Sequence, residues 1–421
     1  MMTSCKLESL HTDVTILILS AVTSLEDLSA LIRASPILYR TFLLAKTSIL
    51  ANISYGDLGP AIRDALILVH TERQPFSSGD RNVYNKRVEE TVANWRTRLL
   101  SSKEDWLRGA SEAEAEHLVR INRTVQYFVD LYARVRFTYF ERELGSKAGC
   151  WGLSITERQQ LAQAFIRCQV ILNLYCAPGL PPFDQGFLVT RVLALFEAWE
   201  MEQISQADTF AYTMCSALVH CENTEAGVPP TPAWWDATRR ALREAAPIAG
   251  AVQDGPIPRG RYYKDYYPKL WSLRRKIIES TSHDPDLMDR ILHWRDVTNG
   301  KMAYTPYKFL HNSHQFQSEY QTRRPPPPSI PCNLASQTPT HPPWGWVEAM
   351  AGHIGDRWGR DLLPSPPNGT AAEIWHATQQ KFEKWRWAGF VFWDMDRAVI
   401  VKEKGLLGEN VGAGWLVAPW G

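Results

Sequence analysis

The sequence predicts an all-α protein, and three observations lead to this prediction. Apolar residues recur in steps of three and four through long stretches, the longest of which runs from residue 112 to residue 140. Two segments, Ser24-Leu25-Glu26-Asp27 and Ser154-Ile155-Thr156-Glu157, fit the capping box that begins a helix. Nothing in the body as far as Leu218 alternates with the period of two that marks a half-buried strand.

The first 55 residues predict a compact N-terminal unit of three short helices. The first helical pattern is carried by Leu7, Leu10, Val14, Leu17, Ile18, Ala21, Val22 and Leu25. A second short helix follows through Leu28, Leu31 and Ile32. Pro36 biases Ser35 away from the helical conformation, so we expect a third helix to resume after it. Three short helices this close to an N-terminus usually form a handle for a partner.

The larger, irregular helical body is expected from residue 56 to residue 322. Its predicted helices cover residues 60–70, 83–100, 112–140, 154–175, 188–199 and 211–218, with a polar loop at 74–80 and a break at 145–152. From residue 239 to residue 296 the pattern predicts further helices, which prolines interrupt.

The last hundred residues predict a linker and a small C-terminal unit. Residues 323–345 contain a run of four prolines and four more beyond it, so they form either a stiff connector or a ligand for an aromatic groove. Residues 346–421 are aromatic-rich, with a helix expected at 371–387. For residues 389–401 two interpretations stay open: two short strands, at 390–392 and 398–401, around Asp394-Met395-Asp396, or a helix that begins at Trp393.

Composition excludes several classes of function. Lys plus Arg number 46 against 45 Asp plus Glu, so no basic field exists to hold nucleic acid or an anionic membrane. No run approaches the roughly 18 apolar residues of a membrane span, and the first residues lack the pattern of a secretory signal. The seven cysteines are scattered, which favours a reducing compartment, and we expect a cytoplasmic or nuclear protein.

The sequence contains no motif that predicts catalysis, a metal site or a cofactor. Cys215, His220 and Cys221 lie close together, but no second pair with zinc spacing accompanies them. Glu200 and Glu202 are two residues apart, so on a helix they diverge and do not share a substrate. The acidic pair in Asp394-Met395-Asp396 is explained by a turn or cap. We therefore expect no catalytic residue, no metal and no cofactor.

The N-terminal helices resemble an F-box, the module that tethers a substrate receptor to an SCF-type ubiquitin ligase. The resemblance is carried by residues 10–14 (Leu-His-Thr-Asp-Val), 18–20 (Ile-Leu-Ser), 24–28 (Ser-Leu-Glu-Asp-Leu) and the tail at 31–39. Further pieces, at residues 153–158, 164–167, 199–202 and 384–394, are similar to elements of divergent fungal F-box-like proteins. His11 stands where an F-box usually has proline, and Tyr39 lies where it usually closes with Cys and Trp.

This resemblance implies a substrate-recognition protein with two partners, the cullin-linking adaptor of an SCF-type ligase and a protein substrate that the sequence does not identify. The apolar residues expected to fill the adaptor's groove are Leu10, Val14, Ile18, Leu25, Leu28 and Leu31. Two alternatives stay open, a non-catalytic helical scaffold that does not dock on a ligase and an enzyme of a class that the sequence does not reveal.

Overall fold

The protein is all-α throughout the part that the computed structural model describes. That part comprises residues 6–73, 81–100, 111–144, 152–175, 191–192, 195–196, 198–223, 269–293, 343, 389–394 and 396–397. Every regular element within these residues is a helix, and no strand occurs among them. The predicted fold class is therefore confirmed. None of the described helices combines the length and the apolar character needed to cross a membrane.

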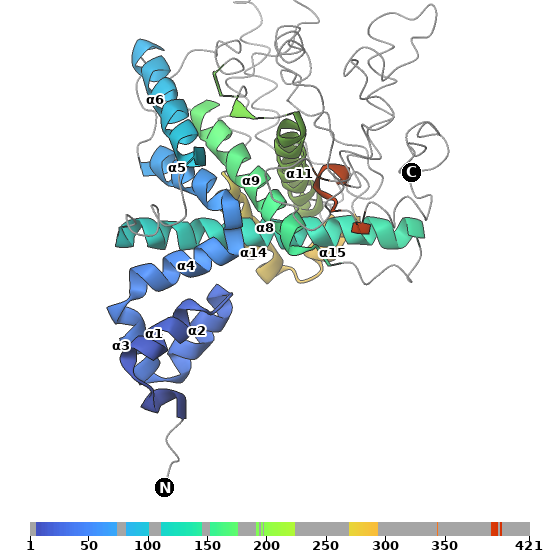
Figure 1. Ribbon diagram of the computed structural model, residues 1–421. Coiled ribbons are helices and arrows are strands. Elements are labelled where there is room, and N and C mark those ends of the chain that lie inside the picture. The colour runs from blue at the N-terminus through green and yellow to red at the C-terminus, as the bar shows by residue number, and fades with distance from the viewer. Residues whose placement is uncertain are drawn as a thin grey trace, which may run out of the picture.

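The N-terminal unit consists of short helices that project from one end of the molecule (Figure 1). They are η1 (Lys6–Ser9), α1 (Thr12–Ser20), α2 (Leu25–Ala34) and α3 (Pro36–Leu44), followed by α4 (Lys46–Leu58). The Ser24 Oγ accepts a hydrogen bond of 3.0 Å from the Asp27 backbone N–H, and Ser35 caps α3 in the same way. Pro36 occupies the first turn of α3, where its missing N–H costs no hydrogen bond.

The unit has its own core, and this core extends to the body. Its buried residues are Leu19, Leu25, Leu28, Phe42, Ile49, Leu50, Ile53 and Ala115. Helix α4 supplies three of these residues, and Ala115 belongs to α8. Because α4 also contributes Ala51 and Leu58 to the main core, it joins the two parts of the molecule.

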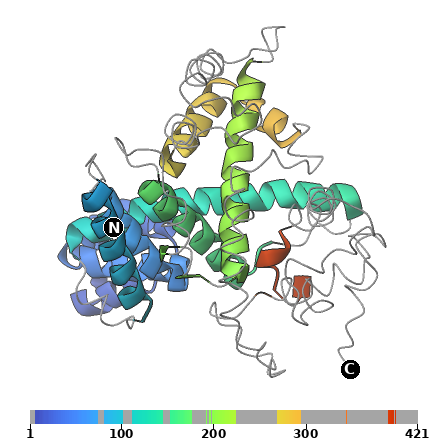
Figure 2. The same cartoon turned by 90° about the horizontal axis from the view of Figure 1, so that it is seen from above.

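The body is built on the long helix α8 (Glu112–Leu144), which runs across the molecule (Figure 1). The other elements are η2 (Gly59–Ala61), α5 (Ile62–Arg73), α6 (Arg81–Leu100), α9 (Ile155–Tyr175), α11 (Ala198–Asn223), α14 (Leu270–His283), α15 (Leu287–His293) and η7 (Phe390–Phe392). Helix α8 packs against α4, α5, α9 and α14, and α9 packs against α5 and α11. Figure 2 shows α11 crossing α8.

Aromatic rings join the three central helices. Phe128 of α8 lies 5.7 Å, between ring centroids, from Phe165 of α9. Phe165 in turn lies 6.1 Å from Phe210 of α11, and Tyr132 of α8 packs edge-on against Phe210 at 5.0 Å. The two edge-to-face pairs, Phe165–Phe210 and Tyr132–Phe210, add about 0.5–1.5 kcal/mol each beyond the burial of their area. These contacts fix the crossing of α8, α9 and α11.

Most predicted helix boundaries in the body agree with the structure, and three expectations need correction. The first helical pattern, expected from Leu7 to Leu25, is divided among η1, α1 and the start of α2. The expected break between a helix ending at Trp199 and another beginning at Ala211 does not exist, because α11 is continuous from Ala198 to Asn223. The strand reading of Phe390 to Phe392 is wrong, because these residues form the 3-10 helix η7. The proposed second strand at 398–401 and the helix at 371–387 lie outside the described residues, as does the proline-rich linker apart from residue 343.

Replacing Phe165 by alanine tests the central core. The Phe165 side chain is fully buried, so we expect Phe165→Ala to lower the free energy of unfolding by about 3–5 kcal/mol. Ile155, at the start of the same helix, is 76% exposed. Urea unfolding should therefore show little change for Ile155→Ala, and equal losses in the two variants would contradict the packing described here.

Candidate functional site

Helix α1 carries an apolar stripe that the described residues leave partly exposed. Thr15 and Leu19 are buried on the inner side of the helix, while Val14 and Leu17 are 43% and 69% exposed. Leu10, which precedes the helix, is 42% exposed. We define Leu10, Val14, Leu17 and the half-buried Ile18 as the α1 stripe. A helix that is apolar on all sides is normally covered on all sides, so this stripe is a candidate contact surface for a partner.

Exposed apolar side chains are concentrated in the N-terminal unit. Of the ten large hydrophobic side chains that are exposed among the described residues, seven lie between residues 10 and 44. In addition to three residues of the stripe, these are Ile37, Tyr39, Leu43 and Leu44 of α3. Helix α3 packs against α1. The N-terminal unit therefore carries most of the exposed large apolar side chains among the described residues.

The structure separates the six predicted docking residues into two groups. Leu10, Val14 and Ile18 lie together on the α1 stripe. Leu25 and Leu28 are 4% and 3% exposed and fill the core of the unit itself, and the half-buried Leu31 packs against that core. A helical apolar pattern marks a residue that becomes buried, but it does not say against what. Leu17 belongs to the stripe and was missing from the predicted set, although its spacing from Leu10 and Val14 indicates the same face.

The N-terminal unit is held on the body by charge as well as by packing. The Lys46 ammonium of α4 donates hydrogen bonds to Glu112 at 2.9 Å and to Glu116 at 2.5 Å, both on α8. The hydrogen bonds to Glu116 and Glu112 raise the pKa of Lys46, and the hydrogen bond from Lys46 lowers the pKa of Glu116. Since these groups are near the surface, they orient the contact more than they stabilise it.

A buried polar network joins α5, α6, α9 and α11. The Asp64 carboxylate is fully buried and accepts hydrogen bonds from Trp95 Nε1 at 2.6 Å and Gln163 Nε2 at 2.7 Å. Arg167 Nε donates to the same carboxylate at 3.2 Å, and its Nη1 donates to Glu200 at 2.6 Å. Burial opposes the charge on Arg167, yet the two carboxylates outweigh it and hold its pKa above the ordinary value. Because each charge has a partner on another helix, the network fixes the positions of these helices relative to one another.

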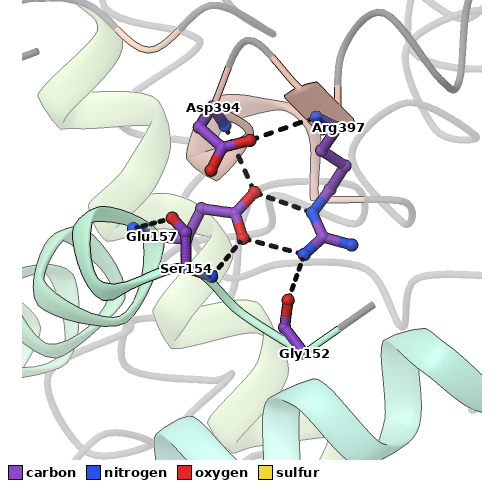
Figure 3. A network of polar contacts seen from close by, with 5 residues as sticks. All are labelled: Gly152, Ser154, Glu157, Asp394 and Arg397. Atoms are coloured by element: carbon purple, nitrogen blue, oxygen red, sulfur yellow. Dashed lines mark hydrogen bonds and ion pairs between the residues drawn. The ribbon is translucent and has the colours of Figure 1, made fainter. Parts of the chain in front are cut away.

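A second buried network fastens the segment at residues 389–397 to the start of α9 (Figure 3). Ser154 Oγ accepts from the Glu157 N–H at 3.1 Å, and the Glu157 carboxylate accepts from the Ser154 N–H at 3.0 Å, which confirms the predicted capping box. The same carboxylate accepts two hydrogen bonds from the Arg397 guanidinium, at 2.7 and 2.8 Å. Arg397 also donates to the Gly152 carbonyl at 2.8 Å.

The ion pair between Glu157 and Arg397 is almost fully removed from solvent, with side chains that are 1% and 7% exposed. Removing one partner of such a pair leaves an uncompensated buried charge, which typically costs 3–5 kcal/mol. Asp394 accepts from the Arg397 backbone N–H at 3.1 Å and donates its own N–H to Glu157 at 3.2 Å. The turn or cap interpretation of Asp394-Met395-Asp396 is therefore confirmed for Asp394.

The remaining chemical candidates form no centre among the described residues. No three His, Cys, Asp or Glu side chains there are grouped so that they could hold a metal ion. Cys215 is half-buried and Cys221 is buried on α11, and burial raises the pKa of the Cys221 thiol. His220 lies on the same helix, but its side chain is outside the described set. Glu200 pairs with Arg167 and Glu202 with Gln206, so the two glutamates diverge as predicted.

Comparisons with known proteins give no match: no protein-family model, no curated protein and no solved structure matches this chain.

A neutral substitution at the half-buried Asp57 should raise the free energy of unfolding, by an amount that depends on pH. Burial raises the pKa of Asp57 despite a hydrogen bond of 2.5 Å from Asn122 Nδ2. A carboxyl whose pKa is higher in the folded state stabilises that state below its unfolded pKa, and this contribution is lost as the pH rises through the folded pKa. We therefore expect Asp57→Asn to be more stable than the wild type at pH 7.

Urea unfolding at several pH values measures this effect. The advantage of Asp57→Asn should shrink as the pH falls below the ordinary pKa of aspartate, about 3.9. Glu90→Gln, which removes an exposed carboxylate on α6, serves as the control and should show no comparable pH dependence. An Asp57→Asn variant that is less stable than the wild type at pH 7 would disprove this account.

Proposed function

We propose that this chain is an F-box-like interaction protein. Its N-terminal unit docks on the cullin-linking adaptor of an SCF-type ubiquitin ligase, and its helical body binds a protein substrate. The observation that supports this proposal best is the α1 stripe, because Val14 and Leu17 on α1 and Leu10 just before it are exposed, while the opposite side of α1 is already buried. A partner that covers this stripe gives α1 the environment that its composition requires.

The energetics favour a docking surface larger than the stripe alone. Burying one large apolar side chain contributes roughly 1.5–3 kcal/mol. Association, in contrast, costs an estimated 4–15 kcal/mol or more, because the two proteins lose translational and rotational freedom. Three or four side chains on α1 therefore give at best a weak complex. The exposed residues of α3, among them Leu43 and Leu44 at 50% and 75% exposure, supply the further apolar area.

The start of α1 keeps its geometry despite the departure from the usual F-box pattern. His11, which stands where proline is usual, is the N-cap of α1, and its Nδ1 accepts from the Asp13 N–H at 3.4 Å. The side chain thus satisfies one of the free N–H groups of the first turn. Histidine at this position is therefore compatible with a normal start of α1, although an F-box usually has proline there.

The second candidate function is a helical scaffold that does not dock on a ligase. It is favoured by one observation, the presence of Ala115 and Val119 of α8 in and around the core of the N-terminal unit. In this case the N-terminal unit is an integral part of the fold of the body, and its contacts serve stability and not the docking of a ligase.

Aspartate substitutions on the α1 stripe test the docking proposal. We expect the full-length chain with Val14→Asp and Leu17→Asp to bind the purified adaptor about 100-fold more weakly or worse, because two side chains lose roughly 1.5 kcal/mol or more each. Val83→Asp is a matched control, since Val83 of α6 is exposed to the same 43% as Val14. Unchanged binding by the double variant, or no binding by the wild type, would contradict the proposal.

Deleting residues 1–45 distinguishes the two candidate functions. Among the described residues, the main core begins at Ala51, so under the docking proposal the remaining chain stays folded and keeps a cooperative thermal transition. The scaffold alternative predicts that the truncated chain unfolds, because Ile49, Leu50 and Ile53 lose the residues that cover them. Circular dichroism with thermal melting distinguishes the two outcomes, because it measures the helix content and the cooperativity of unfolding.

A further inference from the structure

The segment at residues 389–397 is held in the body in the way that a bound peptide is held. Phe390–Phe392 form the 3-10 helix η7, and residues 396 and 397 are helical as well. Val391, Phe392 and Trp393 are 0%, 2% and 3% exposed. The segment thus buries three consecutive apolar side chains although its own helical turns are short.

Side chains of the body contact the backbone of this segment at two points. Gln203 Nε2 of α11 donates to the Val391 carbonyl at 3.0 Å, and Glu157 of α9 accepts from the Asp394 N–H at 3.2 Å. Both groups on the body are buried. Buried side chains that bond to the main chain fix the path and the direction of a short segment, as they do in peptide-binding sites.

Side-chain contacts make the site selective. The Phe392 ring packs edge-on against Tyr132, with centroids 5.6 Å apart. Gly389 has φ +77°, and a Cβ at this position would collide with the Tyr132 hydroxyl, so the site requires glycine there. Arg397 is the charged anchor, because its bidentate pair neutralises the Glu157 carboxylate.

Groups of α8 and α9 that contact the segment are also held by contacts within the body. Glu157 is oriented by the capping box with Ser154. Tyr132 is packed against Phe210 at 5.0 Å, and Phe210 belongs to the aromatic contacts that fix α8, α9 and α11. These contact groups are therefore preorganised on packed helices, which lowers the cost of binding.

We propose that residues 389–397 are an intramolecular ligand, and that the groove between α8, α9 and α11 is a peptide-recognition site. The peptides that fit it carry glycine, then a buried apolar and aromatic run, and an arginine three residues after an aspartate. The site lies apart from the α1 stripe, so this inference does not depend on ligase docking. The tethered segment competes with any external peptide because its effective concentration is high.

A labelled peptide tests the proposal on the full-length chain. The probe is a synthetic peptide with the sequence of residues 389–397, blocked at both ends, and binding is followed by fluorescence anisotropy. We expect the chain with Arg397→Ala to bind this peptide at least tenfold more tightly than the wild type, because its own segment is weakened. Adding Glu157→Gln to that chain, or replacing the arginine of the peptide by alanine, should abolish the gain.

Arg275→Ala is the control variant, because it removes an exposed arginine on α14 that is remote in sequence from the groove. It should bind the peptide no better than the wild type. Equal binding by the wild type and Arg397→Ala, or a gain that survives Glu157→Gln, would overturn the proposal. So would a cooperative loss of the whole fold in Arg397→Ala, because the segment would then be an integral part of the core.

Hydrogen exchange on the wild-type chain gives a second, independent test. An intramolecular ligand opens locally, so the amides of residues 389–397 should exchange at least tenfold faster than those of α8 and α11 that have comparable burial. If the amides of residues 389–397, of α8 and of α11 all exchange at the rate of global unfolding, the proposal is contradicted.

Discussion

The burial of α8 between Ala115 and Val135 is the constraint on which the rest of the structure depends. Near its beginning, Ala115 completes the core of the N-terminal unit. In its middle, Phe128 contacts Phe165 of α9, and further along Tyr132 contacts both Phe210 of α11 and Phe392 of the C-terminal segment. A single rigid helix thus sets the positions of the proposed docking unit, the central core and the proposed peptide groove.

Buried charges add directional specificity to this apolar packing. Asp64 with Arg167 and Glu157 with Arg397 are ion pairs whose side chains are at most 7% exposed. Each pair is embedded in further hydrogen bonds, which is the condition under which the cost of desolvation is offset. The apolar contacts alone tolerate small shifts of one helix against another, whereas a misplaced buried charge does not.

The features that the sequence predicts well are local ones. Periodicity located the long helices, and the spacing from Ser154 to Glu157 predicted the capping box at the start of α9, because both signals arise from neighbouring residues. The continuity of α11 was missed because Gln203, Gln206 and Asp208 look like a polar break. They are in fact buried, and Gln203 bonds to Val391 and Gln206 to Glu202.

Features that join distant residues could not be predicted in this way. Nothing local indicates that Glu157 pairs with an arginine 240 residues later in the chain. The same limit explains why Leu25 and Leu28 were chosen as docking residues: an apolar face that is buried in the unit itself and one that is left for a partner have the same pattern.

Hydroxyl-radical footprinting of the chain, alone and with the ligase adaptor, tests the central claim most directly because it reports the exposure of individual side chains. The docking account predicts that oxidation of Leu10, Val14 and Leu17 falls when the adaptor is added, while that of Val83 and Ile278, which are 43% and 41% exposed, stays the same. Unchanged oxidation of the α1 stripe at saturating adaptor would contradict the account.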